Sequence, residues 1–133
     1  MKKVFTLAAF LFAVAISSSA LAANWVYVTT DEDAGYDVYV DKDSIRHGIH
    51  STKCNISRKD GFSAHIDIRD KYKQESLIFL AAFWRENEKK HMDLLEFFDE
   101  NGNSSPFRST GTEIYESDER GLALFDYVEN NLP

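Results

Sequence analysis

The sequence predicts an α+β protein: an antiparallel β-sheet of about six strands packed against one C-terminal α-helix, after a cleaved N-terminal signal peptide. Three observations lead to this class. Apolar and polar residues alternate with a period of two along most of the chain. Turn-forming segments separate these runs. The last segment, residues 121–132, has its apolar residues on one helical stripe.

The first 22 residues have the pattern of a secretory signal peptide. Two lysines precede an apolar run from Val4 to Ile16, and small residues at Ala20 and Ala22 follow it. The run is well short of the roughly 20 residues that a membrane-spanning helix needs. We therefore expect cleavage after Ala22 and a single mature domain, residues 23–133, in the periplasm or outside a Gram-negative cell. Since no cysteine lies at the cut, no lipid anchor is expected.

The charge of the mature chain limits its partners. Without the two lysines of the signal peptide it has 13 basic and 22 acidic side chains, a formal net charge of −9. Nucleic acids and anionic membranes attract clustered Lys and Arg side chains. We therefore expect neither as a partner, and no integral membrane segment after cleavage.

Cys54 is the only cysteine of the chain, so no internal disulfide can form. The domain must be held together by its hydrophobic core. Two interpretations of Cys54 stay open. It is a small buried hydrophobe at a strand position, or it joins two chains in a disulfide-bonded dimer.

The first half of the mature chain predicts a hairpin and a short helical turn. Residues 25–30 alternate aromatic and β-branched residues, which favours a strand. Residues 31–35 form an acidic turn ending in glycine, and residues 36–41 resume the alternation as a second strand. Residues 42–45 then predict a short helical turn, because Asp and Ser side chains bond nearby backbone donors.

Two more strands follow in the middle of the chain. Residues 49–59 predict a third strand that turns at Asp60-Gly61. Residues 62–72 have the clearest period of two and predict a half-buried fourth strand. Its buried face carries Ala64, Ile66 and Ile68, and its solvent face Ser63, His65, Asp67 and Arg69.

The last third predicts two strands and the helix. Residues 76–85 and 92–98 fit both a helix and a buried strand, and their neighbours favour strands joined by a turn at residues 87–90. The acidic Asn-Gly segment at residues 99–103 predicts a hairpin turn. Ser117 or Asp118 is expected to cap the final helix.

Few residue patterns indicate chemistry. On a strand, His47 and His50 would point to opposite faces, so we expect two solvated histidines and no metal site. His65 and His91 are expected on solvent faces. The turn at residues 99–103 lacks the register of an EF-hand calcium loop. Since no nucleophile motif is visible either, we expect no catalytic residue and no cofactor.

The aromatic residues are the better indication of a site. They exceed what a small core requires. Either they fill one core between sheet and helix, or some of them line an exposed binding face. The residues that we predict for this face are Trp25, Tyr27, Tyr36, Tyr39 and Trp84.

The order of several short motifs resembles the surface-adhesin protein E family of Gram-negative bacteria. Trp25 is followed by a strand ending at Tyr39-Val40-Asp41 and then by Asp43-Ser44-Ile45. Residues 96–103 are similar to the family's aromatic-Asp-x-Asn-Gly hairpin, and residues 122–128 to its closing helix. The resemblance implies about six antiparallel strands packed against a C-terminal helix.

The resemblance also implies a function. The named member of the family binds host matrix and serum proteins such as laminin and vitronectin, and it can dimerise. We therefore expect an exported binding module without catalysis, a monomer or homodimer, whose partner is an extracellular or envelope protein. The chain lacks the family's cysteine pair, with Phe83 and Trp84 about where the first would lie, and its lipid-anchor motif.

Two other functions stay open. One is a periplasmic carrier of a small apolar ligand or cofactor, held in an apolar cleft between sheet and helix. The other is a hydrolase, which would need a cleft with convergent titratable side chains.

Overall fold

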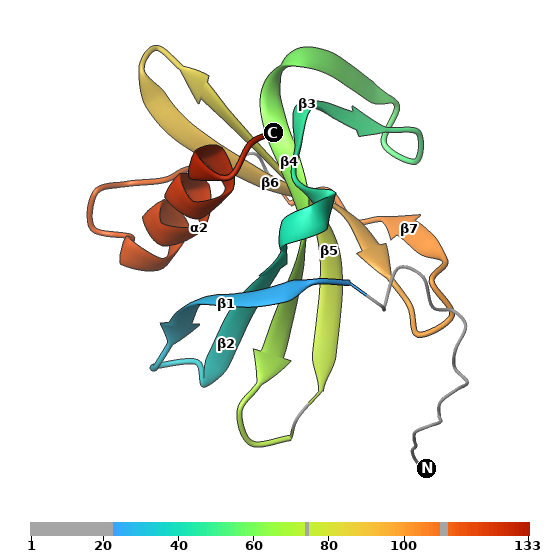
Figure 1. Cartoon of the computed structure of the whole chain (residues 1–133), viewed down its shortest axis with the longest axis vertical. Helices are drawn as coiled ribbons and strands as arrows, with labels where there is room; N and C mark the ends of the chain where they lie inside the picture. Colours follow the sequence, from blue (N-terminus) through green and yellow to red (C-terminus); the bar gives the residue numbers. More distant parts are fainter. Residues whose placement is uncertain (1–22, 74, 110–111) are drawn as a thin grey trace.

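The computed structural model describes residues 23–73, 75–109 and 112–133 (Figure 1). The predicted signal peptide, residues 1–22, lies outside the described residues. One antiparallel sheet and one α-helix confirm the predicted fold class. The elements are β1 (Trp25–Asp31), β2 (Tyr36–Asp41), the 3-10 helix η2 (Lys42–Ser44), β3 (Arg46–Ser51), β4 (Ile56–Asp70), β5 (Ser76–Glu86), β6 (Lys89–Phe98), β7 (Ser104–Pro106), β8 (Thr112–Glu113) and α2 (Glu119–Asn130).

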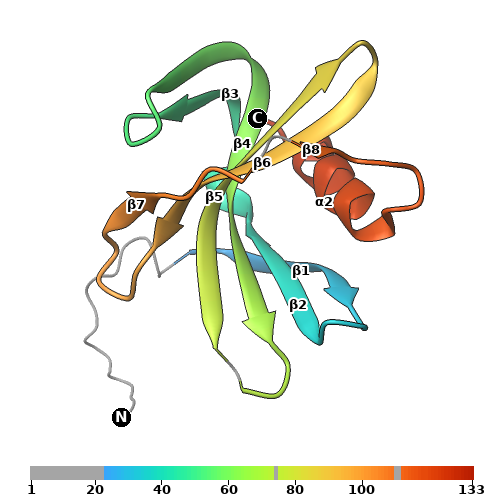
Figure 2. The ribbon, with the colours of Figure 1, turned by 180° about the vertical axis from the view of Figure 1, so that it is seen from behind.

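The strands of the sheet run in the order β1-β2-β4-β5-β6-β7. β3 pairs with the first half of β4, and β2 pairs with its second half. β8 pairs with the beginning of β6 and β7 with its end (Figure 2). Five of the six predicted strands correspond to β1, β2, β4, β5 and β6. The third, predicted at residues 49–59, is wrong in its bounds, because these residues include the end of β3, the turn at residues 52–55 and the beginning of β4. The two strands that the sequence did not predict are the shortest, of three and two residues.

The predicted turn at Asp60-Gly61 is wrong. The chain turns at residues 52–55 instead, and Asp60-Gly61 lies inside the long strand β4. There the register against β3 shifts, since His47 pairs with Phe62 but Ile49 with Arg58. Gly61 has a φ of +82°, which glycine adopts at little cost. The glycine therefore bends the strand instead of reversing it.

Two other turns form where they were predicted. Asn87 and Glu88 have φ values of 54° and 68° and connect β5 to β6. Positive φ at both central residues is typical of the two-residue turn that suits strand twist. In the turn between β6 and β7, the Asp99 carboxylate accepts hydrogen bonds from the backbone N–H groups of Asn101 and Asn103, both at 2.9 Å.

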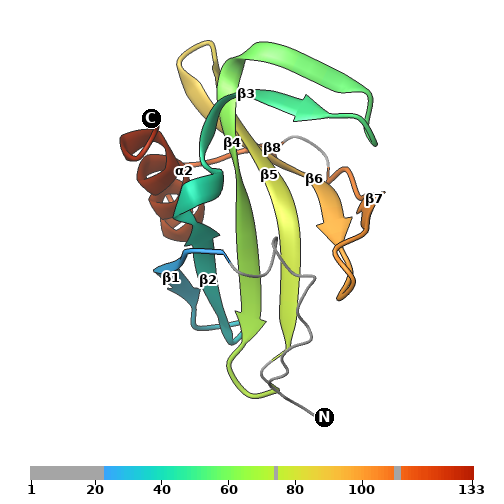
Figure 3. The same cartoon turned by 45° about the vertical axis from the view of Figure 1, so that its right-hand side comes forward.

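The main core lies between the sheet and α2, which packs on one side of the long strands β4 and β5 (Figure 3). The helix begins two residues before the predicted start, and Asp118 caps it by accepting a hydrogen bond from the N–H of Gly121 at 3.0 Å. Its predicted apolar stripe is confirmed, since Leu124, Phe125 and Val128 are buried. The Phe125 ring contacts the rings of Phe62 and Phe83, with centroids 5.0 and 6.0 Å away.

The prediction that one face of β4 is exposed to solvent is wrong. Ser63 and Asp67 are both only 3% exposed. Asp67 is paired with Arg69, whose Nε lies 2.8 Å from its carboxylate. Alternation along one strand shows that its faces differ in polarity. It does not show what other segments cover them.

His65 and His91 are likewise not on free solvent faces. His65 is half-buried, and its ring packs edge-on against Phe98, with centroids 5.1 Å apart. Burial lowers the pKa of His65 because it disfavours the charged imidazolium. His91 stacks on Trp84. Both side chains therefore take part in packing.

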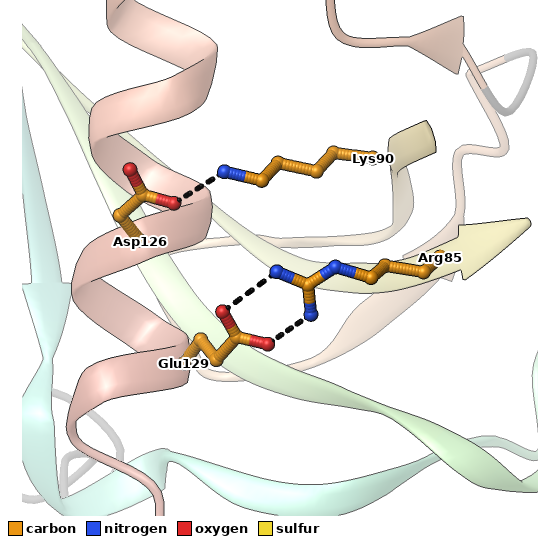
Figure 4. Close-up of polar contacts among 4 residues, drawn as sticks. All are labelled: Arg85, Lys90, Asp126 and Glu129. Atoms are coloured by element: carbon orange, nitrogen blue, oxygen red, sulfur yellow. Dashed lines mark hydrogen bonds and ion pairs between the residues drawn. The ribbon is translucent and has the colours of Figure 1, made fainter. Parts of the chain in front are cut away.

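Two ion pairs fasten α2 to the β5–β6 hairpin (Figure 4). Arg85 donates two hydrogen bonds to the Glu129 carboxylate, one of them 3.0 Å long. Lys90 Nζ lies 2.8 Å from Asp126 Oδ1. Both cations also lie over the ring of Phe125, at 5.0 and 5.2 Å from its centroid. The charged pairs thus border the most deeply buried aromatic residue of the helix.

Glu129→Gln is expected to flatten the loss of stability at acid pH. The hydrogen bonds from Arg85 hold the pKa of Glu129 below its ordinary value of 4.5. A depressed folded-state pKa gives stability that is present above the unfolded value and is lost as pH falls through the folded one. Because the pair is largely solvated, we expect a difference of less than about 1 kcal/mol between wild type and variant. Urea unfolding between pH 6 and 3 measures it, and parallel profiles would contradict it.

Candidate functional site

The five aromatic residues predicted to form one binding face do not come together. Tyr27 and Tyr39 pack edge to face, with centroids 5.8 Å apart. Tyr36 lies three positions before Tyr39 on β2 and therefore belongs to the opposite face. Trp25, half-buried, begins β1. Trp84 lies toward the other end of β5 from this group and packs in a separate apolar cluster.

Trp84 lines a groove that we call the Trp84 groove, on the side of the sheet away from α2. Phe83 contacts Phe125 of α2, so its strand neighbours Ala82 and Trp84 point to the opposite side. The groove has a volume of about 300 Å³ and is open to solvent. Its walls come from β3, β4, β5, β6 and the segment after β7. Its lining residues are Ile49, Ile56, Arg58, Ala82, Trp84, Asp93, Leu95 and Arg108.

The floor of the groove is apolar and tightly packed. Ile49, Ala82 and Leu95 are buried, and Trp84 is half-buried at the edge of this cluster. The Trp84 ring stacks on His91, with centroids 5.5 Å apart and an interplanar angle of 13°. The guanidinium of Arg58 lies 5.4 Å from the centre of the Trp84 ring. These contacts hold the indole in one orientation with part of its surface exposed.

Two arginines and one carboxylate are the charged residues that line the groove. Arg58 forms a two-bonded pair with Asp60, and this hydrogen bonding raises the pKa of Arg58. Asp93 is 3% exposed, and one of its oxygens accepts a hydrogen bond from the Ser109 hydroxyl at 2.7 Å. Arg108 Nε lies 3.5 Å from the other Asp93 oxygen. Both guanidinium groups therefore stand at the rim, while the carboxylate lies in the wall.

Cys54 lies beside the floor of the groove, in the turn before β4. The prediction of a strand position is therefore wrong, although the side chain does pack against the apolar cluster. Its thiol donates a hydrogen bond to the backbone oxygen of Leu95 at 3.0 Å. The contact ties the β3–β4 turn to β6, so Cys54 helps to fix one wall of the groove.

His47 and His50, for which no metal site was expected, are exposed on β3. Within residues 23–73, 75–109 and 112–133, no three His, Cys, Asp or Glu side chains lie close enough to hold a metal ion. The Trp84 groove instead combines an apolar floor, an aromatic ring and two cations. Such a set can hold an apolar side chain and an anionic group next to it.

Sequence reasoning named Trp84 but missed the rest of the groove. Arg58 and Arg108 lie far apart in sequence and in no local pattern. The only signal for Asp93 and Leu95 was the apolar run of β6, which does not say which side faces a cavity.

Comparison with protein-family models, with curated proteins and with solved structures finds no match for this chain. Fold and site define it as an α+β protein with an open, arginine-rimmed apolar groove. In the part of the chain that the structure describes, no helix has the length and apolar character to cross a membrane.

Proposed function

We propose that this protein is an exported, non-catalytic binding module that holds a side chain of an extracellular or envelope protein in the Trp84 groove. One observation carries the proposal: a half-exposed tryptophan in fixed orientation above a buried apolar floor, with two guanidinium groups at the rim. Tryptophan and arginine are enriched among the residues that dominate binding energies between proteins. The sequence's resemblance to the surface-adhesin protein E family supports the same kind of function.

The open shape of the groove favours a protein partner over a small ligand. Small-molecule sites range from about 300 to 1,000 Å³ and bury most of the ligand surface. At about 300 Å³ and open to solvent, the Trp84 groove has room for one or two side chains and leaves them uncovered. In a complex with a protein, the partner's surface around these side chains would shield the groove from solvent.

A carrier of a small apolar ligand is the alternative. The cleft expected for it between sheet and helix is occupied by the packed rings of Phe62, Phe83 and Phe125, with centroids 5.0 to 6.0 Å apart. The Trp84 groove would then have to hold the ligand. Native mass spectrometry of the protein from its own cell envelope, under non-reducing conditions, separates the two. A small bound adduct favours the carrier, and a bound protein favours the binding module.

The proposed function is tested by photo-crosslinking in the cells that export the protein. A benzophenone amino acid replaces Ile56 at the groove rim, and in a matched control it replaces Lys73, which is exposed in the β4–β5 turn. We expect illumination to join a defined protein to position 56 and not to position 73. Equal labelling from both positions, or no protein adduct from position 56, would overturn the proposal.

A further inference from the structure

We infer that the segment bound in the Trp84 groove carries an Asp or Glu side chain next to a large apolar side chain, and that Arg108 recognises its carboxylate. The inference rests on the proposed function and names the chemistry of the partner at the same site. The apolar side chain would lie on Trp84 and Leu95. The neighbouring carboxylate would meet Arg108 at the rim.

Arg108 has N–H donors that make no hydrogen bond to a side chain among the described residues. A guanidinium has five N–H donors in a planar fork. Among the described residues, Arg108 has one charged partner, Asp93, whose oxygen lies 3.5 Å from Nε. That distance exceeds the range of a normal N–H to O hydrogen bond. The side chain is 56% exposed, so its terminal nitrogens can take a carboxylate in a two-bonded pair.

Arg58 has a different role. Both oxygens of Asp60 already accept hydrogen bonds from Arg58, through Nε and one terminal nitrogen. Its guanidinium also covers part of the Trp84 ring. Arg58 therefore shapes the apolar surface and already has a hydrogen-bonded carboxylate, whereas Arg108 has none among the described residues. One such cation matches one carboxylate.

The carboxylate of Asp93 does not prevent an acidic ligand from binding to Arg108. It is 3% exposed and accepts a hydrogen bond from Ser109, so a ligand in the groove meets the guanidinium before the carboxylate. The backbone supports the arrangement. Arg108 has a φ of 48°, and the N–H groups of Phe107 and Ser109 are bonded to the backbone oxygens of Leu95 and Leu94 at 2.8 and 3.0 Å. The segment that carries Arg108 is thus anchored to β6 on both sides of the residue.

The predicted charge of the mature chain makes the site selective. With a formal net charge of −9, most of the surface repels an acidic segment. Such a segment is attracted only where cations stand together beside apolar surface, as Arg58 and Arg108 do. A neutral apolar segment would gain the floor contacts without the ion pair, and a basic segment would be repelled by the guanidinium of Arg108.

Two blocked peptides test the inference. They are N-acetylated, C-terminally amidated pentapeptides of sequence Gly-Leu-Asp-Phe-Gly and Gly-Leu-Asn-Phe-Gly, with sodium decanoate as a third probe. Each is titrated into the ¹⁵N-labelled exported protein, and the signals of the Trp84 indole N–H and the Arg108 Nε–H are followed. We expect the Asp peptide to bind about tenfold more tightly than the Asn peptide, as a charged hydrogen-bonded pair gives.

The variants distinguish recognition from packing. Arg108→Gln is expected to remove the preference for Asp while leaving the affinity for the Asn peptide unchanged. Arg120→Gln, which removes an exposed arginine of α2 outside the groove, is expected to keep it. Equal affinities, no binding of either peptide, a preference that survives Arg108→Gln, or binding of decanoate alone would each overturn the inference. If position 56 still captures a protein in cells after such a result, the proposed function stands and only the inference fails.

Discussion

Phe125→Ala is expected to lower the free energy of unfolding by about 3–5 kcal/mol, the range for a large aromatic side chain removed from a packed core. Phe125 is fully buried and contacts Phe62 and Phe83 across the interface between helix and sheet. The variant loses the transfer free energy of the ring and leaves a cavity that the rigid strands cannot close. It also removes the ring surface under Arg85 and Lys90, so part of the helix anchoring is lost with it.

The free energy of unfolding is measured by urea denaturation monitored by circular dichroism, with Phe107→Ala as a matched control. The same ring atoms are removed in both variants, but Phe107 is 51% exposed and packs edge to face on Phe79 at the margin of the core. Its loss is expected to cost less than half as much, because less apolar surface was removed from water. Equal losses in the two variants would contradict the packing of α2 against the sheet.

Gly61→Ala is expected to destabilise the protein by about 2–4 kcal/mol and to disturb the Trp84 groove. A methyl group at this position would lie 2.7 Å from the backbone oxygen of Phe83 and 3.2 Å from Cβ of Trp84. Both contacts are to the strand that carries Trp84, so relief of the clash must move β4 or β5. Overpacking of this kind costs about 1–3 kcal/mol. The left-handed backbone, with φ at +82°, adds about 1 kcal/mol for any side chain.

Gly102→Ala is the matched control for this prediction. Gly102 has nearly the same φ, +83°, but an added methyl group would meet nothing within 4 Å. The control therefore has only the backbone cost, and the difference between the variants measures the clash. We expect Gly61→Ala also to shift the indole N–H signal of Trp84, while Gly102→Ala leaves it in place. Equal destabilisation by the two variants would show that β4 does not approach β5 at Gly61 as described.

Local patterns were enough to predict most of the fold. Alternation and turn residues placed β1 and β2, and the neighbouring strands and turns placed β5 and β6, whose own residues also fit a helix. The stripe of Leu124, Phe125 and Val128 placed the helix. Gly61 shows where such reasoning fails. Asp-Gly is a turn signal, but the chain had already reversed at residues 52–55, and the glycine serves to bend one long strand. The Asp-Gly pair permits a turn, but the pairing of the neighbouring segments determines whether a turn forms there.

The site could be predicted only in part for a related reason. Trp84 was identified as an aromatic residue in excess of core needs, but it was grouped with Tyr27 and Tyr39, which lie near the other end of the long strands. The groove depends on Arg58 and Arg108, which only the path of the sheet brings to one cavity. No pattern in the sequence predicts that these two arginines line the same groove.

We propose that partner binding takes place at Trp84 and not at the aromatic residues of β1 and β2. The most direct test compares the crosslink yield from position 56 in cells for Trp84→Ala and Trp25→Ala. Melting temperatures confirm beforehand that both variants are folded. We predict that Trp84→Ala lowers the yield at least about tenfold, as expected for a residue that dominates binding, and that Trp25→Ala leaves it unchanged. An unchanged yield in Trp84→Ala, or a loss only in Trp25→Ala, would contradict the claim.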